Sequence, residues 1–338
     1  MRRTAATTGA IAGTGGVLAA AGAAAGAALG ATPWPAALAI RTVFEREARR
    51  TAETMRPFVP EGVGRVAEIV PARDGAPATS ADVFRSAGAG ARPTVVWIHG
   101  GAWISGHRQD VEPYLRMLAA AGYTAIGLDY GRGPESAYPT APRQLLAALE
   151  HLRRHAGRLG IARDRIVLAG DSAGAQLASQ LATAITNPSY ARDAGLVTSL
   201  PVDALRALIL HCGVFDLTGV SKVTGVAGWA FRAALWAYTG RRNWSESTAG
   251  LHMSTIDHVT PRFPPVFLSG GNADPLTARQ SRPFAAHLRT LGVPVTDLFW
   301  GEGHEAQLGH EYQFDFDLPE ARVTLERTLE FLERTTAR

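Results

Sequence analysis

The sequence predicts an α/β protein with a mostly parallel central sheet and helices on both of its faces. Two observations support this prediction. Short apolar runs typical of buried strands alternate with segments whose apolar residues recur at helical spacing, and such alternation is typical of βαβ units. The chain has 338 residues, 46% of them apolar, so it is long enough to bury a large core. Ligand sites of such sheets lie at the carboxyl ends of the strands.

The body of the chain supplies six expected strands and four expected helices. The strands are 94–98, 123–128, 165–169, 205–211, 265–269 and 293–299. The helices contain the apolar positions of 145–152, 177–185, 284–291 and 325–332. Together, residues 65–338 are expected to form one catalytic domain.

Residues 218–254 interrupt this alternation, because they contain no strand pattern and hold three of the seven tryptophans. One interpretation is a crossover helix that packs its aromatic side chains on the sheet. The other is a helical insertion that covers the site as a cap or lid. We expect the cap-like insertion, together with a helical segment at residues 33–64 whose helix runs over 36–55.

The net charge of +4 belongs to the N-terminus, because residues 1–50 hold six arginines and two glutamates and the rest of the chain is neutral. No basic stripe marks the body, so a nucleic-acid partner is not expected. Residues 1–32 form an apolar leader rich in alanine and glycine. It is interpreted as a secretory signal or a membrane anchor, with a leader without targeting role as the third interpretation. Membrane anchoring or export is therefore expected, and a cytoplasmic location is the alternative.

A nucleophile is predicted at Ser172. The strand 165–169 runs into Gly-Asp-Ser-Ala-Gly at positions 170–174, and a helical pattern follows. This is the G-x-S-x-G motif, whose glycines permit a sharp turn that lifts the serine above the sheet. The strand–turn–helix setting favours a nucleophile over a structural turn serine.

An oxyanion hole is predicted where the strand 94–98 ends in His99-Gly100-Gly101-Ala102-Trp103. Unhindered backbone N–H groups stabilise the negative charge that acyl transfer places on a carbonyl oxygen. Gly100 and Gly101 are the expected donors, and Ala173, which follows the nucleophile, is the third. His99 is expected to fix this loop by side-chain hydrogen bonds rather than to act as a base.

The acid and the base are predicted in loops that follow strands. Asp274 follows the strand 265–269, and His304 follows the strand 293–299, so the order Ser–Asp–His suits a sheet of this kind. His304 would accept the proton of Ser172 and Asp274 would orient its ring. His310 remains the alternative base and Asp216 the alternative acid.

These motifs together resemble the α/β-hydrolase superfamily, and more closely its hormone-sensitive-lipase-like carboxylesterases and lipases. The resemblance runs from about residue 90 to the C-terminus. The segments that carry it are 99–103, Asp129-Tyr130, Pro134-Glu135, Tyr138-Pro139, 170–174, Asp274-Pro275-Leu276 and His304. It implies the α/β-hydrolase fold, the triad Ser172, Asp274 and His304, and a lid built from the N-terminal segment and a late insertion. One departure is Ala102, which stands where the family usually has a third glycine.

The predicted function is a serine hydrolase of the carboxylesterase or lipase type, which cleaves carboxylic esters of small molecules through an acyl-enzyme intermediate, without a metal or an organic cofactor. Trp103, Trp229 and Trp236 are expected to form an apolar substrate pocket. Amide or formamide hydrolysis or peptidase activity on the same fold is the nearest alternative. A non-catalytic binding protein is a remote alternative, since all three triad residue types are present. The patterns predict no particular oligomeric state.

Overall fold

The computed structural model describes residues 30–73 and 75–337, and the statements below concern these residues. The leader predicted at 1–32 lies almost entirely outside them. Within the described ranges, no helix combines the length and apolar character that crossing a bilayer requires.

An eight-stranded sheet forms the centre of the described protein, in the order β1-β2-β4-β3-β5-β6-β7-β8. Six of its strands are those expected from the sequence, and neighbours among these six run parallel. They are β3 (Arg92–Ile98), β4 (Thr124–Leu128), β5 (Ile161–Asp171), β6 (Leu205–His211), β7 (Val266–Gly270) and β8 (Val295–Phe299). The prediction of a mostly parallel sheet is confirmed.

The two strands that sequence patterns did not indicate form a hairpin at one edge of the sheet. β1 (Val63–Val70) and β2 (Thr79–Ser86) are antiparallel to each other, and β2 is antiparallel to β4. Most of β1 is exposed, and even Ile69 exposes 76% of its surface. Because most of β1 is exposed to solvent, it needs no run of apolar residues, and hydrophobic periodicity does not reveal it.

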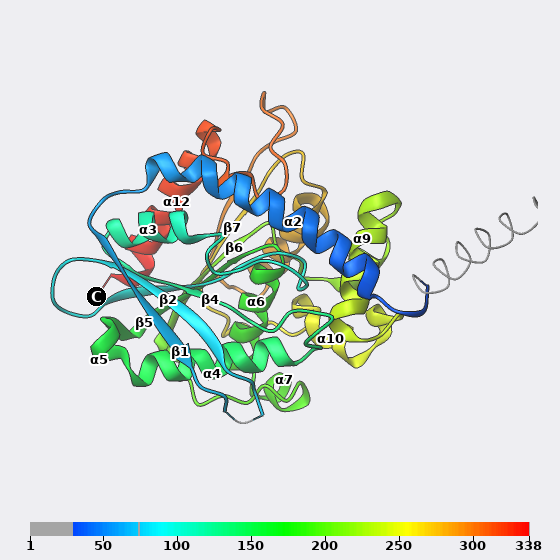
Figure 1. Cartoon of the computed structure of the whole chain (residues 1–338), viewed down its shortest axis with the longest axis horizontal. Helices are drawn as coiled ribbons and strands as arrows, with labels where there is room; N and C mark the ends of the chain where they lie inside the picture. Colours follow the sequence, from blue (N-terminus) through cyan, green and yellow to red (C-terminus); the bar gives the residue numbers. More distant parts are fainter. Residues whose placement is uncertain (1–29, 74, 338) are drawn as a thin grey trace, which may run out of the picture.

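Successive residues of the central strands face two separate cores, one on each face of the sheet. In β3, Ile98 belongs to one core and Trp97 to the other. Figure 1 shows α3 and α12 on one side and α4 on the other. The helices on the Ile98 face are α4 (Thr140–Arg154), α6 (Ala173–Thr186) and α11 (Arg282–Thr290). The helices on the Trp97 face are α3 (Glu112–Ala120) and α12 (Pro319–Thr336). Two short helices, α5 (Ala156–Leu159) and α7 (Pro188–Asp193), lie in connections.

Two segments far apart in the sequence lie together over one end of the sheet. The first is α2 (Trp34–Met55), and the second comprises α8 (Leu217–Ser221), α9 (Gly225–Thr239) and α10 (Thr248–Met253). Figure 1 shows α2 running from the neighbourhood of α3 to α9. α2 and α9 share a small cluster of buried apolar residues that also includes Ile104. The segment expected to be a helical insertion is therefore helical, and α2 is its neighbour.

Arg41 ties α2 to the body of the protein. Both terminal nitrogens of its guanidinium group bond the Glu135 carboxylate at 2.7 Å, in a bidentate pair. The same group donates to two backbone carbonyls, that of Ile104 at 2.6 Å and that of Gly133 at 2.8 Å. One side chain therefore fastens the helix to the loops that follow β3 and β4.

Arg41→Met is expected to lower the free energy of unfolding by about 2 kcal/mol, since it removes hydrogen bonds to a charged partner and leaves two carbonyls unpaired. It should also make α2 more sensitive to limited proteolysis. Urea unfolding and protease digestion measure the two effects. Arg46→Met is the matched control, because Arg46 is exposed on the same helix. Equal behaviour of the two variants would contradict the anchoring role of Arg41.

Candidate active site

Ser172 occupies a strained turn between β5 and α6. Its backbone has φ 51° and ψ −118°, and residues other than glycine rarely adopt such a positive φ. The turn keeps its shape because its flanking positions have no room for a side chain. A Cβ at Gly174 would lie 2.0 Å from the carbonyl oxygen of Ile98. The Ser172 N–H donates to the carbonyl of His211 at 2.9 Å, which fixes the turn to β6.

His310, and not His304, is the histidine that contacts Ser172. The His310 Nε2 atom lies 2.9 Å from Ser172 Oγ, and its Nδ1 atom lies 2.8 Å from Asp274 Oδ2. An Nδ1–H that donates to Asp274 leaves Nε2 free to accept the serine proton. The prediction that His304 is the base is therefore wrong, because His310, the alternative base, lies between Ser172 and Asp274.

His304 is engaged elsewhere by α12. Its Nε2 atom bonds Glu320 Oε1 at 2.7 Å, and its ring lies against Trp300 with the centroids 4.4 Å apart. The chain leaves β8 at Phe299 and continues past His304 in a loop whose Ala306 and Leu308 bond the segment that follows β7, and this brings His310 to Ser172. Residue spacing indicated a histidine beyond β8, but not which of the two the loop would bring back.

Asp274 lies where the sequence predicted, in the loop that follows β7. It is 4% exposed, and its Oδ1 atom accepts the N–H of Leu276 at 2.9 Å. This hydrogen bond points the other carboxylate oxygen at His310. The alternative acid, Asp216, lies before α8, where its N–H donates to Gln280 Oε1 at 2.8 Å. Asp274 is thus the acid that the structure pairs with the histidine.

The surroundings of His310 stabilise the imidazolium that forms when Nε2 takes the serine proton. Burial opposes protonation of the ring, whereas the Asp274 carboxylate, 2.8 Å from Nδ1, favours it and raises the pKa of His310. Burial also raises the pKa of Cys212. The thiol is then neutral near neutral pH, so Asp274 supplies the charge that stabilises an imidazolium. The buried Cys212 thus lies beside the site.

The Gly100 N–H is not available to an oxyanion. It donates to Asp171 Oδ2 at 2.7 Å, while Trp97 Nε1 donates to the other oxygen of the same carboxylate, also at 2.7 Å. The prediction of Gly100 as an oxyanion donor is therefore wrong, because its N–H already donates a hydrogen bond to a buried carboxylate. Within the described residues, the N–H groups of Gly101 and Ala173 have no acceptor in the protein.

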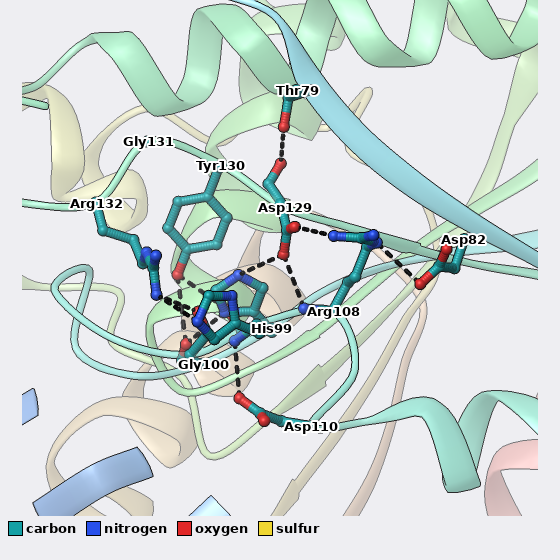
Figure 2. Close-up of polar contacts among 12 residues, drawn as sticks. Thr79, Asp82, His99, Gly100, Arg108, Asp110, Asp129, Tyr130, Gly131 and Arg132 are labelled. Atoms are coloured by element: carbon teal, nitrogen blue, oxygen red, sulfur yellow. Dashed lines mark hydrogen bonds and ion pairs between the residues drawn. The ribbon is translucent and has the colours of Figure 1, made fainter. Parts of the chain in front are cut away.

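The loop after β3 is held by a network of buried polar contacts that Figure 2 shows. His99 bonds the Gly100 carbonyl at 2.8 Å and stacks on Tyr130, whose hydroxyl donates to the His99 carbonyl at 3.0 Å. Burial lowers the pKa of His99 to about 4, so its ring is neutral. Arg108 joins Asp82 and Asp129 behind the loop. The expectation that His99 fixes this loop is confirmed.

A cavity of about 360 Å³, here called the Ser172 cavity, opens in front of the nucleophile. Its apolar lining includes three phenylalanines, Phe44 of α2, Phe231 of α9 and Phe314. None of the predicted tryptophans lines it. Trp103 is 1% exposed and donates to Gln176, Trp229 is 48% exposed on α9, and Trp236 packs beside the core. A wider hollow of about 580 Å³ near Tyr123 contains neither nucleophile nor base.

Two clusters in the described part of the chain have the residue types of a metal site. One is Cys212, His310 and Glu311, and it includes the histidine that already bonds Ser172 and Asp274. The other is Glu68, His151 and His155. In this cluster, Glu68 already pairs with His151 at 2.8 Å and with Arg158 at 2.7 Å.

Comparison with known proteins finds a matching family model and relatives that are named as esterases. A family model described as the alpha/beta hydrolase fold matches residues 95–308. Esterase LipQ of Mycobacterium tuberculosis is 28% identical over 205 residues, which are 60% of this chain and 47% of that protein. An acetyl esterase of Salmonella choleraesuis is 30% identical over 189 residues, 54% of this chain and 55% of that protein. The match thus spans about half the length of these relatives.

Solved structures share the fold over nearly the whole chain. The Pyrobaculum calidifontis esterase superposes with a TM-score of 0.72 at 21% identity, covering 89% of this chain and 94% of that one. Esterase B from Lactobacillus rhamnosis, in a tributyrin phosphonate complex, has a TM-score of 0.74 at 22% identity and covers 90% and 96%. At this identity the likeness establishes the architecture of the sheet and its helices.

Proposed function

The chain belongs to the α/β-hydrolase fold family, as its resemblance to hormone-sensitive-lipase-like enzymes implied, and from that premise we propose that it is a serine carboxylesterase. One observation carries the proposal. Ser172, on its strained turn, is joined through His310 to Asp274 by hydrogen bonds of 2.9 and 2.8 Å. A nucleophile, a base and an orienting carboxylate in this arrangement suit acyl transfer.

The proposed reaction begins with attack of Ser172 Oγ on the ester carbonyl carbon. His310 Nε2 takes the hydroxyl proton as the bond forms, and Asp274 stabilises the imidazolium. Collapse of the tetrahedral intermediate expels the alcohol, which receives that proton from His310 and leaves an acyl-serine. Water then attacks the acyl group with His310 again as base, and the carboxylic acid departs.

The proposed oxyanion donors are the N–H groups of Gly101 and Ala173, with that of Ala102 beside them. The support is that none of the three has an acceptor in the described protein, and that Gly101 and Ala102 line the Ser172 cavity. Both residues of the loop have positive φ, 106° and 51°, so the loop holds a shape that few sequences would adopt freely. Donors fixed before the reaction do not have to reorganise when charge develops.

We further propose that α2 and residues 217–254 form a cap over the cavity. Phe44 and Ala48 of α2 and Phe231 of α9 line it together with the loop after β3. The substrate pocket would then be shaped by two segments outside the sheet. Its volume of about 360 Å³ lies at the small end of ligand sites, which favours short acyl chains.

A panel of p-nitrophenyl esters tests this function. We expect kcat/KM to be highest between acetate and hexanoate and to fall steeply for dodecanoate and palmitate, because the longer chains exceed the cavity. A phosphonate that mimics the tetrahedral intermediate should label one residue, and peptide mass spectrometry should place the adduct on Ser172. Absence of turnover on every ester, or an adduct on another residue, would overturn the proposal.

A further inference from the structure

Carboxylic side chains dominate the charged part of the lining of the Ser172 cavity. Five carboxylic side chains line it, and its lining includes neither arginine nor lysine. The five are Glu47, Asp110, Asp171, Asp274 and Glu311. Because the body of the chain is neutral overall, this imbalance is local to the cavity. In a partly closed space, charges of one sign select the charge of the ligand that enters.

Some of these carboxylates already have partners. Asp274 is balanced by His310, and Asp171 accepts two hydrogen bonds from Trp97 and the Gly100 N–H. Glu47 is exposed at the mouth, where Arg50 lies 3.9 Å away. Solvent screens a pair as exposed as this, so Glu47 contributes little to the electrostatic potential inside the cavity. Within the described residues, no arginine or lysine pairs with Asp110 or Glu311, and the one ionisable base beside Glu311 is His310 of the triad.

Glu311 places its carboxyl group beside both His310 and Asp171. It has φ 60°, and its Oε1 atom lies 3.9 Å from His310 Nε2, on the side of the ring that faces Ser172. Burial and the charge of Glu311 together raise the pKa of Asp171 well above its ordinary value. Two carboxyl groups in contact do not both ionise readily, so they hold one proton between them and present a single negative charge to the cavity.

Asp110 adds a partly buried carboxylate on the other side of the cavity. Its Oδ2 atom accepts the N–H of His107 at 2.7 Å, and burial raises its pKa. The guanidinium groups nearby are occupied outside the cavity. Arg41 pairs with Glu135, Arg108 with Asp82 and Asp129, and Arg132 donates to the Gly106 carbonyl.

The apolar part of the lining suits the same kind of ligand. Phe44, Phe231 and Phe314 line the same cavity as Asp110 and Glu311. Aromatic faces attract substituted ammonium groups, and carboxylates complete the charge balance. A carboxylate on the ligand, in contrast, would meet like charges without a compensating cation.

Resting on the proposed esterase function, we propose that the Ser172 cavity selects esters that carry a substituted ammonium group and excludes esters that carry a carboxylate. Asp110 and Glu311 provide the charge, and the three phenylalanines provide the aromatic surface. Neutral esters of the same size are poorer substrates of the same triad.

Matched esters test this selectivity, in the presence of a chelator so that metal ions do not occupy the carboxylates. On the acyl side, p-nitrophenyl trimethylammoniobutyrate is compared with its isostere, in which carbon replaces nitrogen, and with the hemiglutarate. On the alcohol side, choline butyrate is compared with its carbon isostere. Each kcat/KM is divided by the alkaline hydrolysis rate of the same ester. We expect the cationic ester to exceed its neutral isostere by about tenfold or more on at least one side, and the hemiglutarate to fall below it.

The variants Asp110→Asn and Glu311→Gln should each reduce the cationic-to-neutral ratio, and the double variant should bring it near unity. The ratio is taken within each variant, so a change in the chemistry of His310 cancels. Glu302→Gln is the control, because Glu302 is exposed and does not line the cavity. A ratio near unity in the parent protein overturns the selectivity and leaves the esterase intact, whereas failure to hydrolyse any neutral ester overturns the esterase itself.

Discussion

Ser172→Ala and His310→Ala are each expected to lower kcat/KM for a neutral ester by about 10⁴-fold, and the double variant by no more than either alone. The reason is that the serine and histidine act as one unit through the 2.9 Å hydrogen bond between them. Without the base, the hydroxyl is a weak nucleophile, and without the hydroxyl the base has no proton to move. Steady-state kinetics on p-nitrophenyl butyrate measure all three variants.

His304→Ala is the matched control, since it removes a second imidazole from the same loop. Its effect on kcat/KM should stay within about threefold, because His304 bonds Glu320 and not Ser172. Loss of the contact with Glu320 should appear instead as a modest loss of stability. If His304→Ala abolished turnover and His310→Ala did not, the assignment of the base would be reversed.

The contrast between these histidines shows where sequence reasoning ends. Ser172 and Asp274 were predicted because each follows a buried strand closely, and strand ends are strongly indicated by apolar runs. The base is separated from β8 by a loop that spans residues 300–310. Its course depends on Glu320, which lies on α12 and captures His304. Such a contact between segments has no signature in local residue patterns.

The corrections at the oxyanion loop and in the pocket have a similar cause. Gly100 was indicated by its lack of a side chain, but the Asp171 carboxylate accepts its N–H. Trp103 was expected in the pocket because it is aromatic and near the loop, yet its indole N–H donates to Gln176 in the core. Residue type predicts what a group can do, whereas its direction depends on partners that the fold supplies.

Gly174→Ala is expected to destabilise the protein by at least about 3 kcal/mol, an effect large enough to reduce the yield of folded enzyme. A Cβ at this position would lie 2.0 Å from the Ile98 carbonyl oxygen and 2.6 Å from that of His99. Both atoms belong to backbone at the end of β3, so they cannot move aside as a flexible side chain would. Relief would require α6 to shift away from the sheet and to carry Ser172 with it.

Gly157→Ala is the matched control, because Gly157 is exposed in the short helix α5 and its added Cβ would have no neighbour within 4 Å. That change should leave stability equal or raise it by about 0.5–1 kcal/mol, since alanine loses less backbone freedom in a helix. Urea unfolding of the two variants compares the effects directly. A Gly174→Ala protein as stable as Gly157→Ala would mean that the turn holds Ser172 with room to spare, and the close approach of β3 and α6 would no longer explain why glycine stands there.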